Sequence, residues 1–242
     1  MVEITLQAPA RGKPPKHLLD LPRQDRRDLV RDLGLPPYRA DQASRHMLVR
    51  YSEDVASWSD ISDTDKESLQ RVIPRLLEGV RELTCDEGAT VKYVHRLHDG
   101  SLVESVLMNY PDRTTMCISS QAGCGMNCPF CATGQAGLTR NLSPMEIVSQ
   151  VLSGARAVAE GRAPGRRVSN IVFMGMGEPL ANYSSVVQAL RRLTEPPPAG
   201  MGMSARGITV STVGLVPGIR NLAELGIPVT LAVSLQIGRA HV

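Results

Sequence analysis

Long apolar segments are missing from this chain of 242 residues. No stretch approaches the ~18 consecutive apolar residues of a membrane-spanning helix. The opening sequence, MVEITLQAPARGKPP, also lacks the apolar core of a secretory signal. We therefore expect a cytoplasmic protein, in which cysteines are reduced and serve metal binding or catalysis more often than disulfide bonding. The cysteine count of five is odd, which further argues against a framework of disulfides.

Aromatic residues are scarce, at 3% of the sequence. This argues against an RNA-recognition module that stacks bases on exposed rings. The net charge of +3 is mild and permits a nucleic-acid partner without requiring one. Arginines and backbone groups would have to carry such contacts, and the first part of the chain is rich in arginine: Arg23, Arg26, Arg27, Arg31, Arg39, Arg45 and Arg50. Aspartates are interleaved with them, so a solvated charged surface explains the pattern equally well.

The first third of the chain is predicted to be mostly helical. Residues 1–15 are polar and rich in Pro and Gly, which indicates a disordered arm. Residues 16–82 are predicted to form a small helical accessory domain, because apolar residues recur at helical spacing up to about residue 80. The predicted helices are Asp20–Leu33, Tyr38–Tyr51 and Thr64–Leu77.

The apolar period then changes from helical to alternating. Val91–Leu97 and Ser101–Met108 alternate around Asp99-Gly100, which predicts a β-hairpin extension within residues 83–112. From residue 113 the chain alternates between predicted strands, at Thr115–Ser119, Val168–Met174, Gly207–Ser211 and Val229–Leu235, and predicted helices, at Ser143–Glu160, Tyr183–Leu193 and Val216–Leu225. This order is typical of an α/β fold with a parallel sheet, in which the loops after the strands meet at one edge.

Three cysteines follow the first of these strands at the spacing Cys124-x3-Cys128-x2-Cys131. Iron–sulfur clusters are ordinarily held by four cysteines, so three thiolates would leave one iron open for a small molecule. The alternative is zinc, which needs four ligands. No fourth Cys or His is near this loop, since His95 and His98 are in the hairpin. The pattern therefore favours a cluster-containing enzyme over a non-catalytic, metal-containing RNA-binding module.

Four further sequence motifs surround or follow the triplet: Cys117-Ile-Ser-Ser-Gln-Ala-Gly-Cys124, Gly134-Gln-Ala-Gly-Leu-Thr-Arg-Asn-Leu142, Met174-Gly-Met-Gly-Glu-Pro179 and Ser211-Thr-Val-Gly214. Together they resemble the radical S-adenosylmethionine (SAM) enzymes that methylate C2 of adenosine in 23S rRNA and tRNA, the RlmN type. The resemblance extends from about His17 to Leu235. It implies a partial (β/α)6 radical SAM barrel over residues 113–236, preceded by the helical accessory domain and the β-hairpin.

The resemblance also implies roles for individual residues. Cys124, Cys128 and Cys131 would ligate a [4Fe–4S] cluster, whose open iron binds the amino and carboxylate groups of SAM. An electron from an external donor of the flavodoxin or ferredoxin type would then cleave SAM to a 5′-deoxyadenosyl radical. The other implied SAM contacts are Phe130, Gly177, Glu178, Ser211, Ser234, Leu235 and Gln236.

Two residues outside the SAM site match catalytic positions of the family. Glu104 would be the general base, and Cys117 would help to resolve a covalent RNA–protein intermediate. The residues alone permit other interpretations. Glu104 could be an ordinary exposed strand residue, Cys117 a buried small side chain, and Phe130 a packed loop residue.

The sequence departs from the family pattern near its end. The family reads Ser-Leu-His where this chain has Ser234-Leu235-Gln236, and no cysteine matches the one that carries the methyl group in the family. Residues 237–242 equal the translation of a common sequencing adapter, so we expect a non-native tail and a truncated chain unable to methylate RNA. The related enzymes that methylate C8 of the same rRNA adenine share these motifs and remain an alternative.

Overall fold

The computed structural model describes residues 14–235. Most of the predicted arm, Gln236 and the predicted tail lie outside the described residues. The described part of the chain has η1 (Leu18–Asp20) as its first element, followed by α1 (Arg23–Asp32), α2 (Tyr38–Leu48), η2 (Val55–Ser57) and α3 (Asp63–Gln70). Three helices were predicted here and three are found. The third ends earlier than predicted, because Pro74 lacks the N–H that a helix interior needs and the chain turns into a strand at Glu78.

Seven of the strands in the described part of the chain form one sheet, in the order β1-β2-β3-β4-β7-β8-β9. Its strands are β1 (Glu78–Cys85), β2 (Thr90–Arg96), β3 (Leu102–Asn109), β4 (Thr114–Cys117), β7 (Asn170–Phe173), β8 (Ile208–Thr212) and β9 (Thr230–Val233). The predicted β2–β3 hairpin is confirmed. The prediction that helical structure extends to about residue 80 is wrong, because β1 begins at Glu78 and pairs with β2 along its length.

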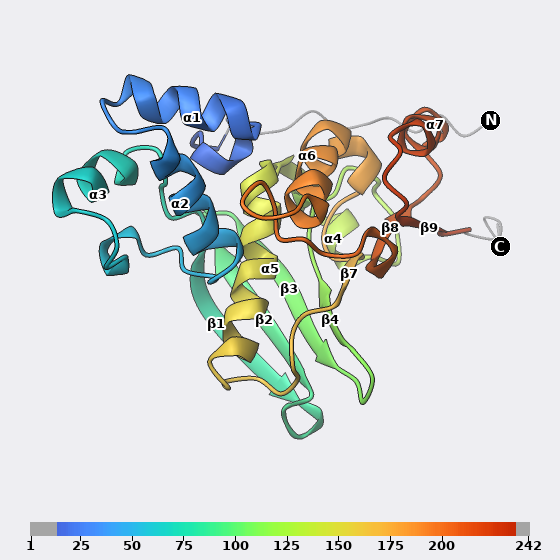
Figure 1. Cartoon of the computed structure of the whole chain (residues 1–242). Coiled ribbons are helices and arrows are strands. Elements are labelled where there is room, and N and C mark those ends of the chain that lie inside the picture. Colours follow the sequence, from blue (N-terminus) through green and yellow to red (C-terminus); the bar gives the residue numbers. More distant parts are fainter. Residues whose placement is uncertain (1–13, 236–242) are drawn as a thin grey trace, which may run out of the picture.

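The antiparallel and parallel parts of the molecule share this sheet. Strands β1 to β4 pair antiparallel, and residues 110–113 connect β3 to β4. Strands β4, β7, β8 and β9 pair parallel, as the alternation of strands and helices predicted. Within residues 14–235 the sheet stays open, with β1 and β9 at its two edges, so the fold is an incomplete barrel (Figure 1).

Helices follow strands β4, β7 and β8 in the chain and cover one face of the sheet. They are α5 (Pro144–Ala159), α6 (Tyr183–Thr194) and α7 (Val216–Glu224), with the short turns η3 (Asp86–Gly88), η4 (Pro179–Asn182) and η5 (Ala205–Gly207) between elements. The sheet residues that face these helices, such as Ile171 and Val210, are fully buried. Residues on the opposite face, such as Val172 and Thr209, are only partly buried. The opposite face is therefore the open one.

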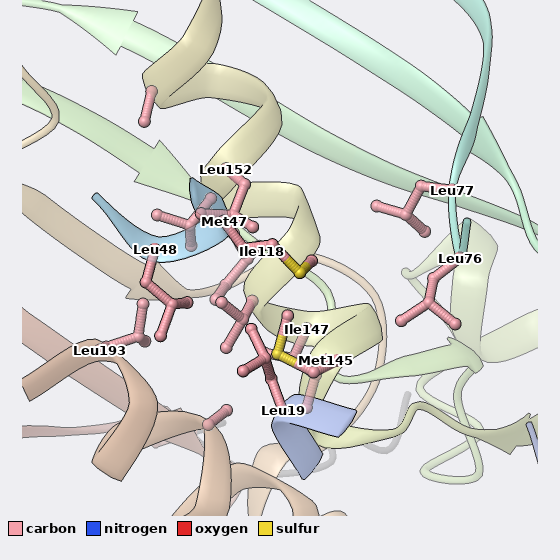
Figure 2. Packing of buried hydrophobic residues seen from close by; sticks show 14 of the residues in the cluster. Leu19, Met47, Leu48, Leu76, Leu77, Ile118, Met145, Ile147, Leu152 and Leu193 are labelled. Carbon is pink, nitrogen blue, oxygen red and sulfur yellow. The ribbon is translucent and has the colours of Figure 1, made fainter. Parts of the chain in front are cut away.

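The helical region and the sheet region share one hydrophobic core. Figure 2 shows Leu19 and Leu48 of the helical region beside Met145 and Ile147 of α5 and Leu193 of α6. All five are at most 1% exposed. Burial of this kind contributes roughly 1.5–3 kcal/mol for each large side chain. The helical region is thus packed against the α/β part. No helix in residues 14–235 combines the length and the apolar character needed to cross a bilayer.

Candidate cofactor site

A small ribbon that the sequence did not predict carries the cysteine loop. Its strands are β5 (Gln121–Gly123) and β6 (Leu138–Asn141), which pair antiparallel. Cys124 follows β5 directly, and its N–H donates to the carbonyl of Gly137 at 2.9 Å. Gly123 has φ +76°, and a Cβ there would lie 2.0 Å from the carbonyl oxygen of Gly137. Glycine is required at this position because the two strands approach too closely for any side chain.

The other two cysteines lie where the loop turns into the short helix α4 (Ala132–Gln135). Cys131 precedes this helix, and its N–H donates to the carbonyl of Cys128 at 3.1 Å. A Cβ on Gly134 would stand 2.9 Å from the backbone nitrogen of Cys128, so the helix packs on the loop backbone. The backbone of the loop therefore closes on itself between Cys128 and Gly134.

The loops after β7, β8 and β9 meet the cysteine loop at one pocket of about 440 Å³. This volume falls in the range of small-molecule sites. Eight of the predicted site residues line it: Cys124, Cys128, Phe130, Cys131, Gly177, Glu178, Ser211 and Ser234. Leu235 does not line the pocket and is 83% exposed, and Gln236 lies outside the described residues. Phe130 is 68% exposed, so it is not held by packing inside the loop.

Glu178 connects two of the loops that line the pocket. Its side chain is buried, and its Oε1 accepts from the N–H of Leu180 at 3.0 Å. Its Oε2 accepts from the N–H of Val213, in the loop after β8, at 2.9 Å. Each carboxylate oxygen has a second lone pair, so the group can still accept a hydrogen bond from a ligand ammonium. The neighbouring Gly177 has φ +96°, and a Cβ on it would lie 2.5 Å from Cβ of Gln121.

The donor chemistry of the pocket fits an iron–sulfur cluster. The pKa of Cys124 is raised by burial and further by the nearby Cys128, Cys131 and Glu178. Ionised thiols here would therefore repel one another and the carboxylate unless a positive centre offsets their charge. No three His, Cys, Asp or Glu side chains in residues 14–235 are arranged to hold one metal ion between them. A cubane cluster needs a different arrangement, because each thiolate binds its own iron.

Glu104 and Cys117 lie outside the pocket but on the open face of the sheet. Cys117 of β4 is the register partner of Val106 of β3, two residues along from Glu104. Side chains two residues apart in a strand point to the same face, so both candidates share that face. Glu104 is partly exposed, and its Oε1 forms an ion pair with Nζ of Lys92 at 2.7 Å. Burial raises the pKa of the Cys117 thiol.

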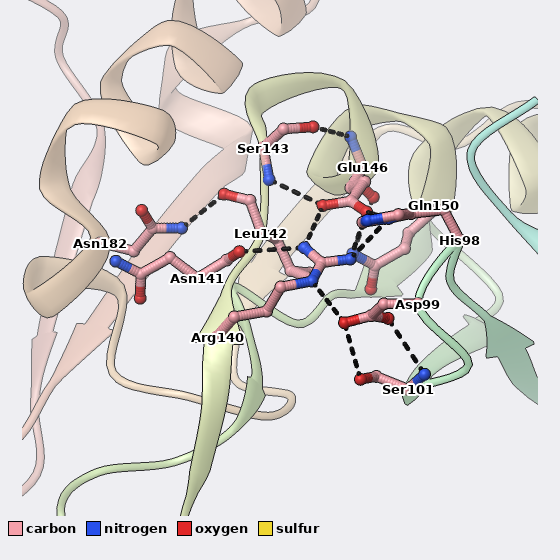
Figure 3. Close-up of polar contacts among 10 residues, drawn as sticks. All are labelled: His98, Asp99, Ser101, Arg140, Asn141, Leu142, Ser143, Glu146, Gln150 and Asn182. Atoms are coloured by element: carbon pink, nitrogen blue, oxygen red, sulfur yellow. Dashed lines mark hydrogen bonds and ion pairs between the residues drawn. The ribbon is translucent and has the colours of Figure 1, made fainter. Parts of the chain in front are cut away.

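A buried polar network behind the cysteine ribbon was missed in the sequence (Figure 3). Arg140 of β6 is 2% exposed and donates to both carboxylate oxygens of Glu146, at 2.8 and 2.7 Å. Its Nε donates to Asp99 of the hairpin turn at 2.9 Å. Glu146 also caps the N-terminus of α5 together with Ser143. The network therefore connects the ribbon, the start of α5 and the hairpin.

The sequence of the α/β part matches a known family. The model of the radical SAM superfamily matches residues 118–242. The chain belongs to the radical SAM superfamily. This membership confirms the resemblance at the level of the superfamily and agrees with the α/β fold, in which the cysteine loop follows the first parallel strand.

Several known proteins are similar over nearly the whole chain. A relative from Streptomyces griseus is 57% identical over 239 residues, which are 97% of this chain and 65% of that protein. One from Thermobifida fusca is 58% identical over 237 residues, with the same coverage. Both are named "Probable dual-specificity RNA methyltransferase RlmN". The chain thus spans slightly less than two thirds of the length of these relatives.

A solved structure is similar as well. The crystal structure of a radical SAM methyltransferase from Sphaerobacter thermophilus superposes with a TM-score of 0.86 at 44% sequence identity. The match covers 91% of this chain and 64% of that protein. The helical region, the antiparallel strands and the incomplete barrel therefore belong to one arrangement that a radical SAM methyltransferase also has.

Proposed function

We propose that this chain is the SAM-activating part of an RNA methyltransferase of the RlmN type. The observation that carries the proposal is the pocket in which the three cysteines meet the loops after β7, β8 and β9. The names of the relatives support an RNA substrate. In more detail, we propose that the full reaction methylates C2 of adenosine in 23S rRNA and tRNA. A cysteine-bound methyl group is the intermediate, and an external donor supplies the electrons.

In this proposal Cys124, Cys128 and Cys131 hold a [4Fe–4S] cluster. When bound, the cluster supplies the electron that cleaves SAM and generates a 5′-deoxyadenosyl radical. Glu178 binds the ammonium group of SAM, since a carboxylate suits a cation in a buried site. Phe130 offers an exposed ring to the adenine, and Ser211 and Ser234 offer hydroxyl groups to the ribose and carboxylate.

Glu104 and Cys117 act on the RNA side in this proposal. The Glu104 carboxylate accepts the proton that leaves the adenine carbon as aromaticity is restored. Cys117 helps to release the RNA from its covalent link to the protein. Their placement on the open face of the sheet supports these roles, because a bulky RNA substrate can reach that face.

Anaerobic reconstitution tests the first half of the proposal. Wild-type protein with iron, sulfide, SAM and a reductant should turn brown and release 5′-deoxyadenosine. Cys128→Ser should lose both signals. Cys85→Ser is the matched control and should lose neither, because Cys85 is an exposed residue of β1 outside the pocket. Colourless protein that binds one zinc would contradict the proposal.

The target atom needs a separate experiment. Mass spectrometry of 23S rRNA and tRNA from host cells with and without the gene of the full-length protein should show 2-methyladenosine that depends on that gene. A gene-dependent 8-methyladenosine would instead assign the C8 reaction. An unchanged modification pattern in both RNAs would contradict the RNA methyltransferase assignment.

A further inference from the structure

A buried hydroxyl links the strand that carries Glu104 to the pocket loop. Ser119 follows β4 and is fully buried. Its Oγ–H donates to the backbone carbonyl of Glu104 at 2.6 Å. The same oxygen accepts from the backbone N–H of Met176 at 2.8 Å. Met176 lies between Gly175 and Gly177, both of which line the pocket. The Ser119 side chain therefore connects the backbone at the candidate base, Glu104, to the backbone of the pocket loop at Met176.

The position of the Ser119 hydroxyl is fixed by contacts on two sides. The backbone of Ser119 is held on both sides by Gln150 of α5, which accepts from its N–H at 2.8 Å and donates to its carbonyl at 3.0 Å. Gln150 is itself fully buried. On the loop side, a Cβ on Gly175 would stand 2.7 Å from the Ser119 Oγ, so the loop backbone packs directly on the hydroxyl. Neither neighbour leaves Ser119 free to move.

We propose that Ser119 is a positioning residue that fixes residues 175–177 at the SAM pocket and in register with the strand of Glu104. This inference rests on the proposed function. Its physical basis is that a group misplaced by ~1 Å can lower a reaction rate by about 10²-fold. A purely structural role would be different: the hydroxyl would only satisfy two buried backbone groups, and its loss would lower stability without changing how SAM binds.

The adjacent residue provides a matched control. Ser120 is also buried, but within residues 14–235 its Oγ has no hydrogen-bond partner. Ser119→Ala and Ser120→Ala remove the same atom from neighbouring buried positions. They differ in that only Ser119→Ala breaks hydrogen bonds.

Amide hydrogen exchange tests the link without any cofactor. In Ser119→Ala the N–H of Met176 loses its acceptor and should exchange about tenfold faster, which corresponds to the loss of one typical hydrogen bond. In Ser120→Ala the exchange of this amide should stay at the wild-type rate. Equal exchange of the Met176 amide in both variants would overturn the proposed link.

The positioning role is tested by the SAM dependence of 5′-deoxyadenosine formation in reconstituted protein. We expect Ser119→Ala to raise the half-saturating SAM concentration about tenfold at normal iron content. Ser119→Thr keeps a hydroxyl and should restore most of the affinity, and Ser120→Ala should match the wild type. Ser119→Ala with lowered iron content or melting temperature but unchanged half-saturation would show a structural role and overturn the proposal.

The two experiments also separate this inference from the proposed function. Wild-type protein that binds a cluster but never cleaves SAM would contradict the proposed function, while exchange at Met176 would still decide whether the hydroxyl holds the loop. Wild-type cleavage with equal SAM dependence in Ser119→Ala and Ser120→Ala would leave the proposed function standing and refute the role of Ser119.

Discussion

Replacing Arg140 with methionine should strongly destabilise the protein. Arg140 and Glu146 form a buried ion pair with side chains 2% and 0% exposed. Removing one partner of a buried pair costs about 3–5 kcal/mol, because the other charge is left without compensation. Glu146 would keep a hydrogen bond from the N–H of Ser143 at 2.9 Å. We therefore expect a loss near the lower end, about 3 kcal/mol in the free energy of unfolding.

Urea unfolding of the cofactor-free protein, followed by circular dichroism, measures this loss. Arg31→Met is the matched control, because Arg31 pairs with Asp28 on the surface of α1 with side chains 61% and 39% exposed. Such surface pairs contribute at most about 1 kcal/mol. In the double variant Arg140→Met/Glu146→Leu the buried carboxylate of Glu146 is removed together with its partner, so the loss of stability should be smaller than the sum of the two single losses. A loss in Arg140→Met no larger than in Arg31→Met would refute the reasoning.

The remaining predictions concern single side chains. Glu178→Gln should lower the free energy of unfolding by about 1.5–3 kcal/mol, because an amide NH₂ would face a backbone N–H that the carboxylate now satisfies; an unchanged urea midpoint would contradict this. Burial lowers the pKa of His95 to about 4 from 6.5, so the unfolded chain binds the proton first and stability is lost as pH falls through this window. His95→Gln should lose less stability between pH 7 and pH 5, and parallel profiles would show that His95 is not responsible. Phe130→Ala should leave the melting temperature unchanged but weaken SAM binding measured by calorimetry, and equal affinity would remove Phe130 from the site.

Local sequence patterns were sufficient to predict those elements whose structure depends on neighbouring residues. The alternation around Asp99-Gly100 identified the hairpin, because the Asp-Gly turn signal and a period of two are both written in neighbouring residues. The cap of α5 is local in the same sense, since Ser143 and Glu146 are three residues apart. The order of strands and helices after residue 113 likewise follows from successive apolar segments.

Strand β1 could not be found in this way. All eight of its residues are exposed, so it carries no buried face and no alternation of apolar residues. Its pairing with β2 decides that it is a strand. The burial of Arg140 could not be predicted for a related reason. Its buried guanidinium is stable only because it pairs with Glu146 and Asp99, which belong to other elements.

The sequence by itself indicated the superfamily of this protein and its candidate cluster ligands, because the spacing of Cys124, Cys128 and Cys131 and the motifs around them are properties of neighbouring residues. Only the tertiary structure decided how these parts are held together. The bonds from Ser119 to Glu104 and from Val213 to Glu178 join residues 15 and 35 positions apart. Such contacts depend on strand register and on the order of strands in the sheet, which a local pattern does not contain.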